Sequence, residues 1–415
     1  MKNVHKVCAS ALLRTFAFAA LTIALQAPAH AQDKTWDTFA IELTNHFSKG
    51  EYKDAITVGV KALAYSERTF GANHATTGTS LNNLATLYQA IGQYDKAVPM
   101  SVRALAISEK TRGLEHLVTG ARLSVLAGLY KSLGQYDKAL PLSLRALNIA
   151  EKAQGKEHPN TGEELNGLGE IFEAMEQYEK ALPLFVRALE ISEKAQGPDH
   201  PNTGTRVNNI AAVYQATGQF DKALPLFVRA LNISEKTDGS DHLNTSIPVN
   251  NLSQLFLAMG QYEKALPLSV RALSISEKAL GPDHPNTGER LNNLAGIYQA
   301  MNQYNLALPL FVSALSVSEK AQGQEHPITS VRLNNLAALY QLMGQYEKSL
   351  PLFVRALRVS EKVQGPEHPS TARRLNNLAA LYEAMGQMDK AQPLYARALA
   401  ISKKAQGPGP RGNKP

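Results

Sequence analysis

The stretch TGTRVNNIAAVYQATGQFDKALPLFVRALNISEKTDG, residues 203–239, contains two apolar patterns of helical period separated by a glycine. In the first pattern Val207, Ile210 and Tyr214 fall on one face of a helix, which ends near Gly218 because glycine adopts the left-handed C-terminal conformation easily. The second pattern is apolar on nearly all sides, which is typical of a helix covered by its own partner and by a neighbouring unit. The stretch therefore predicts a pair of packed helices.

The ends and the packing of the two helices can be predicted in more detail. Thr203 stands where the N-cap of the first helix belongs. The second helix is expected to run from about Phe220 to Lys236 and to direct Phe227 and Ala230 inward. Pro225 lies inside this helix, where its ring and missing N–H predict a bend without a break.

The same pattern recurs along the chain with a period of 42 residues, marked by Gly71, Gly113, Gly155, Gly197, Gly239, Gly281, Gly323, Gly365 and Gly407. A unit of this length cannot bury its own apolar face and must pack on its neighbours, so the period predicts an all-α solenoid. Asn302 and Glu176 replace the glycine that ends the first helix in two units. Because glutamate adopts the left-handed conformation poorly, we expect an altered turn at Glu176.

The first 31 residues differ from the repeats. Lys2, Lys6 and Arg14 precede an apolar run from Thr15 to Leu25, and a small-residue site follows at residues 29–31. This pattern predicts a secretory signal peptide, cleaved before residue 32, and a periplasmic or secreted location. A membrane anchor is the alternative, but the apolar run is shorter than the ~20 residues that a spanning helix needs.

Charge and cysteine content exclude several classes of function. The formal net charge of +7 falls to +4 without the first 31 residues, and the remaining charges are interleaved along the repeats, so we expect no nucleic-acid partner. Cys8, the single cysteine, lies in the predicted signal peptide. The exported chain would therefore contain no disulfide, thiol nucleophile or thiolate metal ligand.

The residues Leu84, Ala85 and Tyr88, followed by Ala97 and Ala104, resemble the tetratricopeptide repeat. The 42-residue period and the phrases Leu-Asn-Asn-Leu-Ala and Gly-x-x-His-Pro-x-Thr are similar to the repeats of kinesin light chain and its bacterial relatives. The resemblance implies a right-handed α-α superhelix of tandem helix pairs, whose concave face binds peptides or proteins. It divides the chain into a capping repeat at 32–70, eight repeats at 71–406 and a basic, flexible tail at 407–415.

Two columns of asparagines are the first candidates for ligand binding. The first Asn column is Asn82, Asn166, Asn208, Asn250, Asn292, Asn334 and Asn376, and the second Asn column is Asn83, Asn209, Asn251, Asn293, Asn335 and Asn377. At 100° per residue the second column points away from the apolar stripe, toward the expected groove, where carboxamides could hold a peptide backbone. The alternative is that one column bonds to an adjacent helix and only fixes the repeat spacing.

A second candidate set, the inner Arg column, lies two residues before the first Asn column and consists of Arg122, Arg206, Arg290, Arg332 and Arg374. Exposed arginines there could select acidic or carboxylate groups of a partner. The alternative is a solvated helix flank paired with nearby glutamates. A further arginine column on the second helices, from Arg103 to Arg397, is interpreted as structural.

No pattern in the sequence indicates catalysis, a cofactor or a metal. The histidine column from His74 to His368 supplies one imidazole per unit, so neighbouring units cannot share a metal, and we interpret these residues as turn and packing residues. We therefore predict a noncatalytic, exported scaffold that binds a peptide or protein on its concave face and does not span a membrane. The alternative is a structural protein of the cell envelope that acts by self-association.

Overall fold

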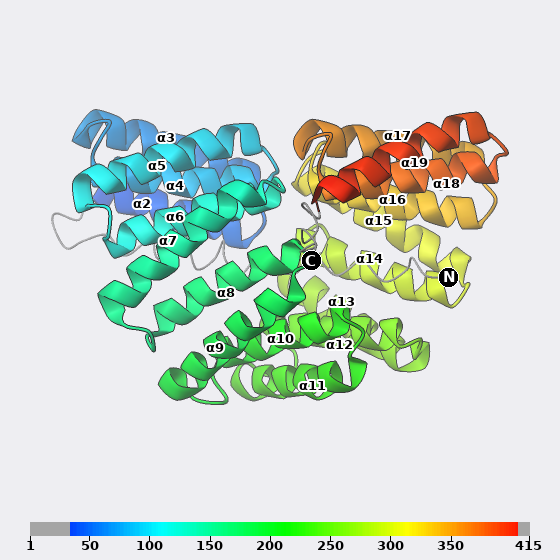
Figure 1. Cartoon of the computed structure of the whole chain (residues 1–415), viewed down its shortest axis with the longest axis horizontal. Coiled ribbons are helices and arrows are strands. Elements are labelled where there is room, and N and C mark those ends of the chain that lie inside the picture. Colours follow the sequence, from blue (N-terminus) through cyan, green and yellow to red (C-terminus); the bar gives the residue numbers. More distant parts are fainter. Residues whose placement is uncertain (1–33, 406–415) are drawn as a thin grey trace, which may run out of the picture.

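The computed structural model describes residues 34–405, in which eighteen α-helices form nine consecutive hairpins (Figure 1). The first helices of the hairpins, here called A helices, are α2 (Lys34–Ser48), α4 (Ala75–Ala90), α6 (Leu117–Ser132), α8 (Pro159–Ala174), α10 (Pro201–Ala216), α12 (Ser246–Ala258, preceded by the 3-10 turn η1, Leu243–Thr245), α14 (Pro285–Ala300), α16 (Pro327–Leu342) and α18 (Pro369–Ala384). The second helices, or B helices, are α3 (Tyr52–Phe70), α5 (Tyr94–Arg112), α7 (Tyr136–Gln154), α9 (Tyr178–Gln196), α11 (Phe220–Thr237), α13 (Tyr262–Leu280), α15 (Tyr304–Ala321), α17 (Tyr346–Val363) and α19 (Met388–Ala405).

Each A helix packs on its own B helix and on the B helix of the preceding hairpin, so the hairpins stack as the 42-residue period predicts. The predicted signal peptide and basic tail lie outside the described residues. Within residues 34–405 no helix is sufficiently long and apolar to cross a bilayer.

In most repeats the A helix begins at a histidine rather than at the predicted threonine. In α10 the His200 Nδ1 atom accepts the backbone N–H of Asn202 at 3.1 Å, and histidines take the same N-cap position before α4, α6, α8, α14, α16 and α18. In the remaining repeat His242 caps η1, and Thr245 is the N-cap of α12 without a side-chain hydrogen bond. The N-cap prediction for Thr203 is therefore wrong. Its hydroxyl is buried and donates to the Gly197 carbonyl at 2.8 Å, which ties the loop to the first turn of the helix.

The turn between the A and B helices is the same in every hairpin. Gly218 has φ +75°, and the two replacements Asn302 (φ 59°) and Glu176 (φ 58°) adopt the same left-handed conformation. The hydrogen bond from Gln177 N to Phe172 O, 2.8 Å long, matches that from Gln219 N to Tyr214 O. The altered turn predicted at Glu176 is thus wrong, because the surrounding bonds hold the glutamate in a conformation that is costly for its side chain.

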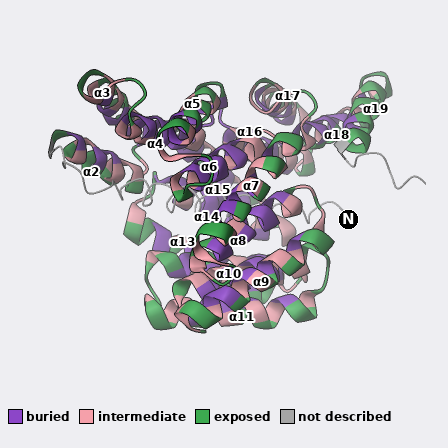
Figure 2. Cartoon of the chain, turned by 60° about the vertical axis from the view of Figure 1, so that its left-hand side comes forward, coloured by how far each residue is buried: buried purple, intermediate pink, exposed green. Residues whose placement is uncertain are grey.

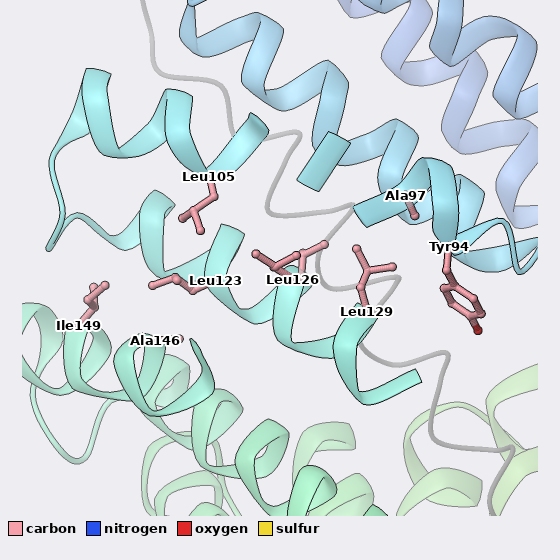
Figure 3. Packing of buried hydrophobic residues seen from close by; sticks show 9 residues of the cluster. Tyr94, Ala97, Leu105, Leu123, Leu126, Leu129, Ala146 and Ile149 are labelled. Carbon is pink, nitrogen blue, oxygen red and sulfur yellow. The ribbon is translucent and has the colours of Figure 1, made fainter. Parts of the chain in front are cut away.

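Alanines fill the closest helix crossings. The column Ala104, Ala146, Ala188, Ala230, Ala272, Ala314, Ala356 and Ala398 is buried throughout, as expected for sites that a larger side chain would overfill. The leucines of α6 then bridge successive hairpins, since Leu123 and Leu126 pack between α5 and α7 (Figure 3). The core therefore lies between A and B helices as a series of apolar clusters along the array, and buried residues line the facing sides of the helices (Figure 2).

Ion pairs connect neighbouring B helices on the outer face. Arg229 in α11 contacts Glu193 in α9 at 2.6 Å, and the same pair recurs as Arg103–Glu67, Arg145–Glu109, Arg187–Glu151, Arg271–Glu235, Arg355–Glu319 and Arg397–Glu361. Their exposure limits each pair to about 0–1 kcal/mol of stability. The pairs link successive hairpins, which agrees with the structural role predicted for this arginine column.

The superhelix completes a turn within the chain, so that hairpins six repeats apart meet. The A–B turn at Gly92 lies against His326 and Pro327 at the start of α16, and the turn at Gly134 lies against His368 at the start of α18. Figure 1 shows the corresponding approach of the ends of α5 and α6 toward the group formed by α15–α19.

Candidate functional site

The inner face of the superhelix is built from the A helices. In Figure 2, α4, α10 and α16 lie inside, whereas α3, α11 and α17 lie at the periphery. One stripe of α10, at positions spaced by three and four residues, keeps partial contact with solvent, and it consists of Thr205, Asn208, Ala212 and Gln215. This spacing places the four side chains on one side of the helix, so they form its contribution to the inner face.

The asparagines form a ladder of hydrogen bonds along this face. In each bond the Nδ2 atom of the second Asn column donates to the Oδ1 atom of the first Asn column in the preceding repeat. The bonds are Asn209–Asn166 (2.7 Å), Asn251–Asn208 (2.8 Å), Asn293–Asn250 (2.9 Å), Asn335–Asn292 (2.9 Å) and Asn377–Asn334 (2.7 Å). The ladder therefore joins six successive A helices, from α8 to α18.

The ladder is broken at its N-terminal end. Val125 stands in the second Asn column where a partner for Asn82 would lie, and neither the Oδ1 nor the Nδ2 atom of Asn82 has a hydrogen-bond partner. Asn82 is nevertheless only 1% exposed. A buried polar group without a partner costs stability, so this rung is a weak point of the array.

The predicted direction of the second Asn column does not hold for all of its members, because half of them are buried. Asn209 is buried and bonds between α8 and α10, which is the contact to an adjacent helix that the alternative interpretation expected. Most other members of the two columns are buried as well, namely Asn82, Asn83, Asn166, Asn250, Asn292, Asn293 and Asn334. Asn208, Asn251, Asn335 and Asn377 are half-buried, and Asn376 is exposed. Whether these residues bind a ligand stays a prediction.

The inner Arg column is also buried between A helices, in contrast to the exposed positions that both interpretations of the sequence assumed. Arg206 bonds to Glu163 of the preceding repeat, and Arg290 and Arg374 donate Nε–H to Ser246 and Ser330, each at 3.0 Å. Arg332 is 4% exposed. Burial lowers the pKa of Arg122 to about 10 and, together with the neighbouring Arg373, that of Arg374 to about 9.

The helix α8 carries an acidic cluster that the sequence reasoning missed. Lys131 contacts Glu170 at 2.8 Å, and Ser124 donates to Glu164 at 2.6 Å. Burial raises the pKa of Glu164 and of Glu173 to about 7. Alignment of the repeats could have revealed the cluster, because Glu170 occupies the position taken by Ala212 in α10.

Among the described residues, one group of side chains is placed closely enough to hold a metal ion. His46, Glu51 and Asp54 lie close enough together to share a cation, but the His46 Nδ1 atom already bonds to the Glu51 carboxylate at 2.6 Å. This geometry is that of an ordinary surface hydrogen bond.

Comparison with known proteins identifies the repeat family of this chain. A tetratricopeptide repeat model matches residues 44–110, 119–194, 164–209, 205–277, 249–320 and 329–404. A putative kinesin light chain with nearly identical repeats from Podosopora anserina is 30% identical over 50% of this chain and 99% of its own, with a TM-score of 0.42.

Two more distant structures share the fold over longer stretches. A Rap protein complexed with competence and sporulation factor is 15% identical, covers 89% of this chain and 99% of its own, and has a TM-score of 0.60. The apo form of RapI is 14% identical, covers 70% and 99%, and has a TM-score of 0.51. No match was found among curated proteins.

Proposed function

The chain belongs to the tetratricopeptide repeat family, with 42-residue repeats of the kinesin light chain type, and we propose that it is a noncatalytic scaffold whose inner face binds an extended peptide or a protein surface. The solved complex of a Rap protein with competence and sporulation factor supports a binding role for this fold. The family and the inner face described above support interaction rather than chemistry.

The observation that carries the proposal is that the ladder uses only part of each carboxamide. Asn335 and Asn377 donate through Nδ2 to the preceding repeat, and both keep contact with solvent, so their Oδ1 atoms can accept from a ligand. Asn208 accepts through Oδ1 and can donate through Nδ2. Such bonds contribute about 0.5–1.5 kcal/mol each, so several must act together along an extended segment.

Substitution of the inner face tests the proposal without disturbing the ladder. Gly296 in α14 has no atom within 4 Å of where a Cβ would lie, so Gly296→Arg fills open space on the inner stripe. Val228→Arg places the same charge on the outer face of α11, where the side chain is exposed. Peptides selected from a random library against the wild-type protein should lose affinity for the first variant and keep it for the second. Equal affinity for both variants would exclude the inner face as the site.

Export remains part of the proposal, supported by the composition of residues 1–31. The native protein should then begin at Gln32 and be recovered outside the cytoplasm. Mass spectrometry of the N-terminal peptide from fractionated cells tests this, and a retained Met1 in the cytoplasmic fraction would contradict it.

Self-association is the second candidate, favoured by a column of aliphatic side chains on the outer face. Val60, Val102, Leu144, Val186, Val228, Val270, Val312 and Val354 recur every 42 residues and are each 37–49% exposed. Light scattering across a concentration series tests this role. An oligomer that dissociates on Val186→Glu, Val228→Glu and Val270→Glu would support it, and a monomeric wild type at every concentration would reject it.

A further inference from the structure

The inner stripe changes in chemistry from one A helix to the next. In α10 it consists of four neutral residues, Thr205, Asn208, Ala212 and Gln215. The corresponding positions of α8 are Glu163, Asn166, Glu170 and Glu173, and those of α12 are Ile247, Asn250, Gln254 and Leu257. The array therefore places an acidic stripe and a partly apolar stripe on the two sides of a neutral one.

The other repeats show which of these residues the fold does not require. The last position of the stripe is a glutamine in four A helices, namely Gln89, Gln215, Gln299 and Gln341. Glu173 and Leu257 take this position in α8 and α12, although both helices pack on their B helices as the others do. The architecture of the repeat thus does not explain the charge of Glu173 or the apolar side chain of Leu257.

One carboxylate of the acidic stripe lacks a partner. Lys131 of α6 contacts Glu170 at 2.8 Å, and Arg206 of α10 contacts Glu163 at 2.5 Å, whereas Glu173 forms no hydrogen bond or ion pair within residues 34–405. Burial and the charge of Glu170 raise the pKa of Glu173 to about 7, and Lys131 offsets only part of that rise. A cationic group beside Glu173 would supply the partner that the fold does not.

The stripe of α12 holds an unpaired polar group between apolar side chains. Gln254 is 7% exposed, and its Nε2 atom has no hydrogen-bond partner among the described residues. Ile247 is 41% exposed, and Leu257 is half-buried. A buried N–H without an acceptor costs stability. A ligand whose carbonyl accepts from Gln254 and whose aliphatic side chain covers Ile247 and Leu257 would remove this cost.

The separation of the two stripes determines the spacing of the groups that they can contact. Side-chain bonds join α8 to α10 and α10 to α12, through Asn209–Asn166 and Asn251–Asn208. Neighbouring A helices therefore lie about 10 Å apart, and α8 and α12 about 20 Å apart. Because an extended chain advances about 3.3 Å per residue, about six residues of a ligand reach from one stripe to the other.

We propose that the segment bound on the inner face carries a lysine or arginine that contacts Glu173 in α8 and, about six residues away, an aliphatic side chain that contacts Ile247 and Leu257 in α12. The inference rests on the proposed function, because it names the chemistry of the peptide that the inner face binds. The cationic group donates charge-assisted hydrogen bonds to the carboxylate. The residues between the two anchors lie on the neutral stripe of α10, which selects among them less strongly.

Selection of peptides reads the two preferences separately. A random library of peptides about twelve residues long, twice the expected spacing, is selected at pH 8 against the wild-type protein and its variants. Glu173→Gln, and the pair Ile247→Thr with Leu257→Gln, introduce the residues that α10 carries at the same positions. Glu179→Gln removes the same charge from the exposed start of α9 and is the matched control. Equal helical circular dichroism will show that all of them fold.

The wild-type protein and the Glu179→Gln control should select peptides with a basic residue about six positions from an aliphatic one. Glu173→Gln should remove the basic preference and keep the aliphatic one, and the α12 pair should do the reverse. In one selected peptide, replacement of the basic residue by glutamine should weaken binding to the wild type at least about tenfold, as loss of a hydrogen bond to a charged group does. The same replacement should have little effect on binding to Glu173→Gln.

Two results would overturn the inference. One is a set of peptides that lose affinity on Gly296→Arg but show no basic or aliphatic enrichment. The other is an equal loss for the wild type and Glu173→Gln when the basic residue of the peptide is replaced. Peptides that keep their affinity for Gly296→Arg would exclude the inner face itself, so failure of the proposed function has a different signature.

Discussion

Truncation of two equivalent asparagines should reduce stability to different extents, depending on whether the ladder is complete around them. Asn82 and Asn250 occupy the same column and are 1% and 2% exposed, so alanine removes a similar volume and gains the same helix propensity at both sites. Asn250 accepts from Asn293 at 2.9 Å, whereas Asn82 has no partner at either polar atom.

The magnitudes follow from these partners. Asn250→Ala leaves the Asn293 carboxamide without its acceptor and should cost about 1–3 kcal/mol beyond the cavity. Asn82→Ala removes an unpaired buried carboxamide, and the relief of about 1–3 kcal/mol should offset most or all of the cavity cost. We therefore expect Asn250→Ala to be more destabilising than Asn82→Ala by at least about 2 kcal/mol.

Hydrogen exchange with mass spectrometry suits this comparison, since repeat arrays open locally and a global midpoint averages over many hairpins. Peptides from α4 and α12 report the free energy of local opening in each variant, and urea unfolding provides a second measurement. Asn292→Ala serves as a replicate, because Asn292 also accepts from the next repeat. Equal losses at Asn82 and Asn250, or a larger loss at Asn82, would refute the role assigned to the ladder.

Three further predictions concern other parts of the array. Glu164→Gln should raise stability at pH 8 by about 1–2 kcal/mol and leave it unchanged at pH 4. The folded pKa of about 7 lies above the unfolded value, so the free energy of unfolding of the wild-type protein falls as the pH rises between the two values. The same difference between variant and wild-type urea curves at both pH values would contradict this. Leu294→Ala should cost about 2–5 kcal/mol by leaving a cavity at a buried position of α14, and an unchanged urea midpoint would contradict it. Glu176→Gly should raise stability by about 0.5–1 kcal/mol, because glycine adopts the left-handed conformation without the steric cost that glutamate has. A lower melting temperature of the variant would show that contacts of the glutamate side chain stabilise the turn by more than this cost.

Much of the local structure was predictable because it depends on the period and on residues close in sequence. The hairpin of Phe220–Thr237 with its preceding helix, the left-handed Gly218 and the buried Ala230 column all follow from helical spacing and side-chain size. The choice of His200 over Thr203 as the N-cap was missed, because both residues can accept a backbone N–H and the sequence does not say which of them begins the helix.

The inner face was less predictable, because helical spacing gives the direction of a side chain but not what covers it. Asn209 and Arg206 lie three residues apart and face the preceding A helix, a contact that depends on how closely adjacent hairpins approach. The contacts between hairpins six repeats apart depend on the small rotation between neighbouring hairpins, accumulated along the array. No residue in a single 42-residue unit determines that sum, so the burial of His326 could not be read from the sequence.

The contacts between hairpins six repeats apart all have the same separation in sequence, and this has a consequence for how such a chain can change in length. Because Gly50, Gly92 and Gly134 each meet the histidine six units ahead, an in-frame duplication of one unit presents the same residue types to the next coil in a new pairing. Unequal recombination between near-identical segments could therefore lengthen the protein without passing through a form in which its coils no longer fit.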